Sequence, residues 1–183
     1  HAMRDGRESC GIHPMSRIAA CSWSLRTESP DALADALTRC GINAVQLALV
    51  PYIEQPAVWG TAIERLRARG ITVVSGMLAT VGEDYSTLQT IERTGGVRPA
   101  ATWAQNESLA RATAAIAGDH GIPLVTLHAG FLPHDRQDAE RAAMITRLRT
   151  VADIFAARGV RIAFETGQES ADTLLGALAD IAH

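Results

Sequence analysis

Three polar side chains stand at the ends of short apolar segments, from which a side chain can reach a bound molecule. Glu165 ends VRIAFE, His128 ends LVTLH, and we place Gln46 at the end of a third such segment. A carboxylate in this position can transfer a proton or act as a hard oxygen ligand for Mg²⁺, Mn²⁺ or Zn²⁺. An imidazole can ligate a metal or bind a substrate oxygen. An amide can orient a hydroxyl group but cannot act as a base.

Purely structural roles are also open for these residues. Glu165 could cap a helix or pair with a cation at the strand end, and His128 could be packed with its hydrogen bonds satisfied. Glu169 follows four residues after Glu165 and fits a solvated acid in the first turn of a helix, where the helix dipole favours negative charge. The residue types alone do not separate these roles from catalytic ones.

Aromatic side chains supply candidate contacts for an apolar sugar face. Trp23 follows the first apolar segment, and Tyr85 and Trp103 lie in the long stretch 78–106. An isolated tryptophan is more often part of a core than part of a binding site, so packing is the alternative for both tryptophans. We take Trp23, Gln46, Tyr85 and Trp103 as candidate substrate-binding residues.

A repeated pattern positions these residues. Four times a helical stretch is followed by glycine, then Ile or Val, then an apolar run. The glycines suit left-handed helix ends, and they are Gly41, Gly70, Gly121 and Gly159. Each run is short and apolar at both alternating positions, as in a strand buried on both faces. With the opening segment, this pattern predicts five strands near 17–23, 43–49, 71–77, 122–128 and 160–165.

Helices are expected between these strands. Ser29 is placed to cap a helix over 30–40 that begins with Pro30. The other expected helices include 104–120, 137–158 and about 170–182. Such alternation without hairpins predicts an α/β fold with a parallel sheet, either an open doubly wound sheet or a (β/α)8 barrel. The turn SLRTESP after the first strand contains no glycine, which disfavours a dinucleotide-binding site. The stretch 78–106 is too long for a simple connection and is expected to be a lid.

Composition excludes several functions. The 183 residues suit one domain, and the net charge of −3 argues against nucleic-acid binding by bulk charge. All 17 basic residues are arginine, so a Schiff-base lysine is excluded. No apolar run is long enough to predict a membrane span, and three cysteines without paired spacing suit the cytoplasm. We expect residues 1–14 to be a tag or disordered leader and 15–183 to form the domain.

Several segments together resemble the xylose isomerase-like TIM-barrel superfamily of sugar phosphate isomerases and epimerases. They are ACSWSL, CGINAVQLAL, GEDYSTLQTIERTGG, LVTLHAG and IAFETGQE, in that order. The resemblance implies a (β/α)8 TIM barrel, of which this chain supplies about five βα units as a truncated or incomplete barrel. It also implies a small carbohydrate substrate, and we expect a possible homo-oligomer.

The resemblance further implies a divalent-metal-dependent isomerase or epimerase that transfers a proton through an enediolate. Glu165 then corresponds to the metal ligand on strand five, Glu169 to a catalytic base, and His128 to a group that positions the substrate. The other metal ligands of the family lie on strands six to eight. The alternatives are a catalytically incomplete fragment, a non-enzymatic binding protein, or a dehydratase or endonuclease IV-like hydrolase on the same fold.

Overall fold

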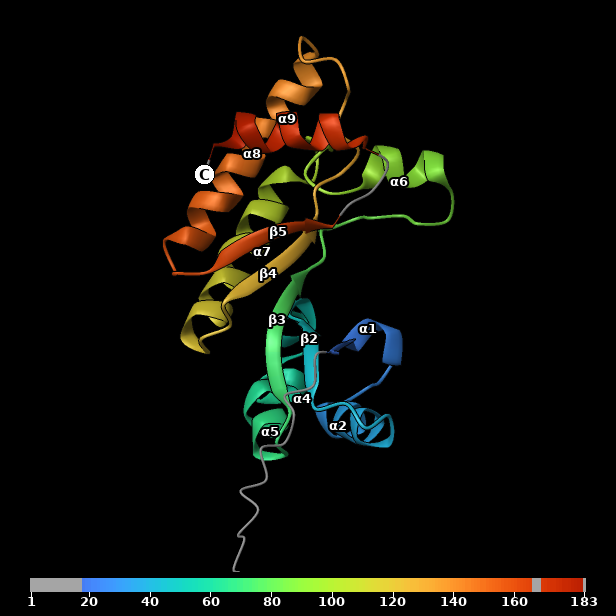
Figure 1. Cartoon of the computed structure of the whole chain (residues 1–183), viewed down its shortest axis with the longest axis vertical. Coiled ribbons are helices and arrows are strands. Elements are labelled where there is room, and N and C mark those ends of the chain that lie inside the picture. The colour runs from blue at the N-terminus through green and yellow to red at the C-terminus, as the bar shows by residue number, and fades with distance from the viewer. Residues whose placement is uncertain (1–17, 166–168, 183) are drawn as a thin grey trace, which may run out of the picture.

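A single parallel sheet organises the chain (Figure 1). The computed structural model describes residues 18–165 and 169–182, so the expected leader over 1–14 lies outside the described residues. The strands are β1 (Ala20–Cys21), β2 (Ala44–Ala48), β3 (Thr72–Leu78), β4 (Leu124–His128) and β5 (Arg161–Glu165). All five predicted strands are therefore confirmed. The described part of the first strand is shorter than predicted, and residue 17 lies outside the described part of the chain.

Strand order decides between the two predicted architectures. The strands lie in the order β1-β2-β3-β4-β5, and each pairs in parallel with the next one along the chain. A doubly wound sheet reverses its strand order at a switch point, whereas a TIM barrel adds each strand beside the previous one. The fold is therefore the barrel type, and the chain supplies five of its βα units.

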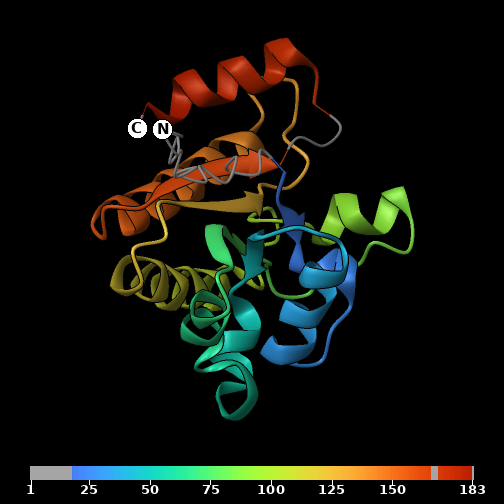
Figure 2. The same ribbon diagram turned by 60° about the horizontal axis from the view of Figure 1, so that its bottom comes forward.

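The main helices lie outside the curved sheet, as Figure 2 shows. The larger ones are α2 (Pro30–Arg39), α5 (Ala62–Ala68), α7 (Trp103–Asp119), α8 (Ala139–Ala156) and α9 (Ala171–Ile181). Shorter ones are α1 (Ser22–Leu25), α3 (Val50–Glu54), α4 (Pro56–Trp59) and α6 (Leu88–Thr94). None of the helices in the described ranges has the length and apolar character needed to cross a membrane.

Local signals in the sequence account for the helix ends. The Ser29 hydroxyl accepts a hydrogen bond from the backbone N–H of Ala32 at 3.2 Å, which confirms it as the cap of α2. The four predicted helix-ending glycines adopt positive φ, a conformation that favours glycine because it lacks Cβ. Their φ values are 67° at Gly41, 74° at Gly70, 63° at Gly121 and 68° at Gly159.

The two faces of β4 differ in chemistry. Val125 and Leu127 are fully buried beneath the helices. Thr126 and His128 alternate with them and so belong to the opposite face of the sheet, together with Glu165, which is paired in register with His128. Helix packing therefore fixes β4 on one face and leaves its polar residues on the face that would line the inside of a barrel.

The stretch 78–106 is more ordered than the sequence suggested. It contains α6 and the beginning of α7, so it is not a structureless loop. The side-chain oxygen of Asn106 accepts a hydrogen bond from the backbone N–H of Val81 at 2.7 Å. Arg147 donates to the carbonyls of Val97 and Arg98 at 2.7 and 2.6 Å. These contacts fasten both sides of the stretch to the helix layer.

Candidate active site

A chain of hydrogen bonds connects β2, β4 and β5 near the carboxyl ends of the strands. Gln46, which the sequence placed at the end of its strand, is instead the central residue of β2. The side-chain amide of Gln46 on β2 donates to the hydroxyl of Thr126 on β4 at 3.0 Å. The same hydroxyl donates to Oε1 of Glu165 on β5, also at 3.0 Å. Thr126 therefore fixes the Glu165 carboxylate and links it to Gln46, two residues that the sequence singled out separately.

A buried carboxylate–imidazole pair lies at the same end of the sheet. Oε1 of Glu83 is 3.4 Å from Nδ1 of His128, and the two side chains are only 8% and 12% exposed. The backbone N–H of Gly96 donates to the same Glu83 oxygen at 3.0 Å. Burial by itself raises the pKa of Glu83, but the polar side chains of His128 and Thr80 and the backbone N–H of Gly96 lower it below its usual range. Glu83 is therefore an ionised, buried carboxylate at neutral pH.

Tyr85 completes this cluster from the loop between β3 and α6. The ring centroid of Tyr85 lies 6.2 Å from that of His128. The ring of Phe131 makes an edge contact with His128, also with 6.2 Å between the centroids. Burial, and then the negative charges of Glu83 and Glu165, raise the pKa of Tyr85 to about 12. The phenol therefore stays protonated and can donate a hydrogen bond. We call Gln46, Glu83, Tyr85, Thr126, His128 and Glu165 the mouth of the sheet.

The remaining predicted site residues are placed differently. Trp23 lies in α1 and is 46% exposed, and in the described residues no ring contact joins it to His128. Trp103 begins α7, and the guanidinium carbon of Arg147 from α8 lies 5.7 Å from its ring centroid, a cation–π contact within the helix layer. Glu169 accepts a hydrogen bond from the backbone N–H of Leu132 at 3.2 Å. The structure thus joins Gln46, Tyr85, His128 and Glu165, and gives the other three separate surroundings.

Sequence reasoning missed two residues of the mouth, Glu83 and Thr126. Thr126 lies two residues before His128 in a strand, so the period of two places both on one face and could have identified it. Glu83 follows Gly82 in the long stretch that was assigned to a lid, and no local pattern distinguishes it from Asp84 beside it. Its pairing with a residue 45 positions later becomes visible only in the fold.

Metal binding requires more donors than this mouth arranges. Across residues 18–165 and 169–182, no group of three or more His, Cys, Asp or Glu side chains is placed to hold a metal ion. Catalytic zinc sites, for comparison, take about three protein ligands. Glu165 remains a chemically suitable ligand, but within the described residues it is not part of a group of three or more such donors.

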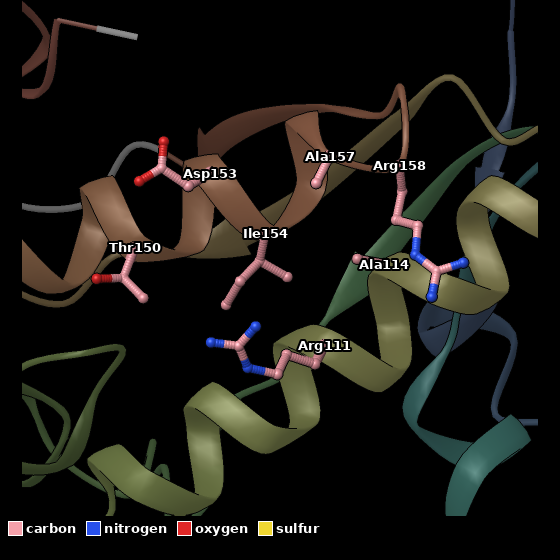
Figure 3. A pocket seen from close by; sticks show the side chains of 7 residues that line it. All are labelled: Arg111, Ala114, Thr150, Asp153, Ile154, Ala157 and Arg158. Atoms are coloured by element: carbon pink, nitrogen blue, oxygen red, sulfur yellow. The ribbon is translucent and has the colours of Figure 1, made fainter.

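Other cavities lie away from the mouth and are lined by different residues. One of about 450 Å³ lies between α7 and α8, with Arg111 and Arg158 at its walls (Figure 3). It includes the last turns of α8, and because a helix in a βα unit runs opposite to its strands, these lie toward the amino ends of the strands. A smaller cavity of about 300 Å³ includes Glu169 and His134.

Comparison with known proteins identifies the family. The family described as xylose isomerase-like TIM barrel matches residues 34–182, so this chain belongs to that family. The resemblance inferred from the sequence is therefore confirmed. Among proteins with curated descriptions, none matches the chain closely in sequence.

Solved structures show the same fold over most of the chain. A xylose isomerase domain protein from Planctomyces limnophilus is 25% identical with a TM-score of 0.78, over 92% of this chain and 60% of that one. An L-ribulose 3-epimerase is 18% identical with a TM-score of 0.66, over 92% and 58% of the two chains. A xylose isomerase-like protein from Mycobacterium smegmatis in complex with magnesium is 16% identical with a TM-score of 0.62, over 91% and 61%. This chain therefore spans about 60% of the length of these structures.

Proposed function

We propose that this chain contributes to a sugar isomerase or epimerase, which moves a proton on a small sugar or polyol through an enediolate. The observation that carries the proposal is the mouth of the sheet, where Thr126 orients the Glu165 carboxylate beside the buried Glu83–His128 pair. Family membership and the 3-epimerase among the structural neighbours support this choice of substrate class.

This proton transfer requires a base, a hydrogen-bond donor and a group that orients the substrate. A base removes a proton from the carbon next to a carbonyl, and the electron pair moves onto the carbonyl oxygen. Return of a proton to the other side of the same carbon restores the carbonyl group and gives the epimer. Return of a proton to the former carbonyl carbon gives the isomer when the proton of the neighbouring hydroxyl group moves to the former carbonyl oxygen, so that the new carbonyl forms on the first carbon. Glu165 is the candidate base or metal ligand, His128 and the protonated Tyr85 can bond substrate oxygens, and Gln46 can orient a hydroxyl group.

Metal dependence is part of this proposal. A divalent ion would stabilise the negative charge that develops on the substrate oxygens. Glu165 would contribute one ligand, a hard oxygen donor that suits Mg²⁺, Mn²⁺ or Zn²⁺. The magnesium complex of the Mycobacterium smegmatis protein supports such an ion. Within the described part of the chain, Glu165 does not belong to a group of three or more such ligands.

Binding without turnover is the second candidate. The observation that favours it is the lack of a three-ligand metal cluster within the described part of the chain. On this alternative, the mouth holds a sugar through Gln46, Tyr85 and His128, and no carbon-bound proton is exchanged.

Hydrogen exchange separates the two candidates. Small ketoses such as D-allulose, D-tagatose and L-ribulose are incubated with the protein in D₂O, with and without Mn²⁺ or Mg²⁺, and deuterium at carbon is followed by NMR. The proposal predicts exchange next to the carbonyl, and a rate lower by roughly 100-fold or more in Glu165→Gln. The control Glu107→Gln removes a carboxylate that pairs with Arg111 on α7 and should retain the full rate.

Two results would count against this assignment. Equal exchange rates in Glu165→Gln and in the unchanged protein would remove Glu165 from the reaction. Binding of a ketose without any exchange, under every ion tested, would favour the binding candidate over the enzyme.

A further inference from the structure

The Glu83–His128 pair joins two parts of the chain that are distant in sequence. Glu83 belongs to the loop after β3, and His128 is the last residue of β4. In the described residues, His128 is the basic side chain that lies within ion-pair distance of Glu83. Because Glu83 is buried and ionised, its charge needs hydrogen-bond donors, and His128 Nδ1 at 3.4 Å and the Gly96 amide at 3.0 Å are placed to supply them.

The backbone of the following segment holds the imidazole in place. A Cβ atom added to Gly95 would lie 2.9 Å from Cε1 and 3.1 Å from Nδ1 of His128. A Cβ atom on Gly96 would collide with the backbone of Ala129 and Gly130. The two glycines therefore allow this segment to lie directly against the end of β4, where it restricts rotation of the His128 ring.

The position of Glu83 beside Nδ1 favours one of the two neutral forms of the ring. A neutral imidazole has one N–H donor and one acceptor nitrogen, and a hydrogen bond from Nδ1 to a carboxylate favours the form protonated at Nδ1. Nε2 then keeps its lone pair. Free of a proton, Nε2 can accept a hydrogen bond from a hydroxyl group or from water.

We propose that Glu83 is a positioning residue that keeps His128 protonated at Nδ1, so that Nε2 accepts a hydrogen bond from a substrate hydroxyl group. The identity of that hydroxyl as part of a sugar rests on the function proposed above. The positioning itself concerns residues of this chain alone and can be measured without any substrate.

A purely structural role for Glu83 makes a different prediction. If Glu83 served only to receive the Gly96 N–H, then Glu83→Gln would retain an oxygen for that bond and leave His128 unchanged. If the negative charge sets the tautomer, the same variant must alter His128, because a side-chain amide can present either its oxygen or its NH₂ group to Nδ1.

The test is a tautomer measurement on the whole chain. Protein with ¹⁵N-labelled histidine is studied by long-range ¹H–¹⁵N NMR at about pH 8, where an ordinary imidazole is neutral. The His128 signals are assigned by their loss in His128→Asn. We expect His128 to carry its proton on Nδ1, and the ratio of the Nδ1–H to the Nε2–H form to fall about tenfold in Glu83→Gln.

A matched control is available on the surface. Glu64 lies 3.3 Å from Nδ1 of His120, and the Glu64 side chain is more than half exposed. Glu64→Gln should therefore leave the His128 signals unchanged.

Two outcomes would overturn the proposal. One is the finding that Nε2 of His128 carries a proton in the unchanged protein, whether the ring is neutral or cationic. This measurement does not depend on whether a variant folds. The other is an unchanged tautomer ratio in a folded Glu83→Gln. Neither outcome depends on whether the protein acts on sugars, so this test and the deuterium exchange test can fail separately.

Discussion

Strand β5 contributes to two regions of opposite chemistry. Its carboxyl end supplies Glu165 to the mouth, where polar side chains are fixed by hydrogen bonds of 3.0 to 3.4 Å. The outer side of β5 lines a groove of about 550 Å³, which we call the edge groove. Its lining residues fall within 152–164, from the end of α8 into β5, and within 178–181 of α9. Ile162, Phe164 and Leu178 give this groove an apolar lining.

The comparison shows how differently the two regions depend on their residues. Polar groups removed from water need partners at defined distances, so a single change in the mouth leaves another group without its partner. Apolar contacts depend on area and volume, so the walls of the edge groove tolerate surface changes but not the loss of a buried side chain beneath them. Among the described strands β5 pairs only with β4, and such an open strand edge is a surface to which another strand can add.

The largest effect is expected from the helix that walls the edge groove. Phe155 in α8 is completely buried, so Phe155→Ala should lower the free energy of unfolding by about 3–5 kcal/mol. Leu175 in α9 is 64% exposed, and Leu175→Ala should change stability by less than about 0.5 kcal/mol. Urea denaturation measures both, and equal losses would contradict the distinction between core and surface.

A smaller loss of stability is expected from the buried Glu83–His128 pair of the mouth. Glu83→Ala leaves the Gly96 N–H and His128 Nδ1 without their acceptor, and should cost about 2–3 kcal/mol of unfolding free energy. Glu64→Ala removes the exposed partner of His120 and should cost at most about 1 kcal/mol. A loss at Glu83 no larger than the loss at Glu64 would show that burial adds nothing to this pair.

Glu83 also makes the free energy of unfolding depend on pH in a defined direction. The pKa of Glu83 is lowered in the folded protein, so its ionised form stabilises the fold above the ordinary glutamate pKa of 4.5. That contribution is lost as the pH falls below 4.5 and through the lowered folded pKa. The stability difference between the unchanged protein and Glu83→Gln should therefore shrink on acidification, as urea denaturation at a series of pH values would measure. A difference that grows toward acid would contradict the lowered pKa.

A modest effect is expected from the hydroxyl that links β2, β4 and β5. Thr126→Val retains the shape of the side chain but removes both hydrogen bonds, and should cost about 1 kcal/mol of stability. In the deuterium exchange assay it should lower the rate less than Glu165→Gln does. Thr126→Ser keeps the hydroxyl group and should retain most of the exchange rate. A Thr126→Val variant that retained the full exchange rate would exclude a role for the hydroxyl group.

The smallest effect is expected on the rim of the edge groove. Leu178 in α9 is 46% exposed, so Leu178→Glu should change stability by less than about 1 kcal/mol while it weakens the binding of an apolar fluorescent dye. Leu88→Glu in α6, which is exposed but outside this groove, is the control. Dye binding that falls equally in both variants would place the apolar site elsewhere.

Much of the fold was predictable because its signals are local. Each of the four helix-ending glycines is followed by an apolar run, so the strands β2 to β5 were located within two residues of their observed ends. The segment LQTIERT has only two aliphatic residues, Leu88 and Ile91, too few to establish a helical period, and α6 was therefore missed. Its start is fixed instead by hydrogen bonds between Thr87 and Thr90, a capping box without the usual acidic residue.

The mouth was only partly predictable because its contacts are distant in sequence. Glu165 and His128 were found from their positions at strand ends, since strand ends at one edge of a parallel sheet meet. Gln46 was also placed at a strand end, but it lies in the middle of β2. Glu83 reaches His128 across 45 positions, and Thr126 reaches Glu165 across 39, so neither pairing leaves a local pattern. Trp103 was a reasonable candidate by residue type, but the structure places Arg147 against its ring.

The proposal that the mouth binds a sugar is tested most directly by mapping where a ketose contacts the protein. Isotope-labelled protein is titrated with D-allulose in the presence of Mg²⁺, and chemical shifts are followed for the mouth, the edge groove and the cavity between α7 and α8. We expect shifts at Gln46, Tyr85, Thr126 and His128 that saturate together, with Leu178 and Arg111 unchanged. Saturable shifts confined to the edge groove or to the α7–α8 cavity would contradict it.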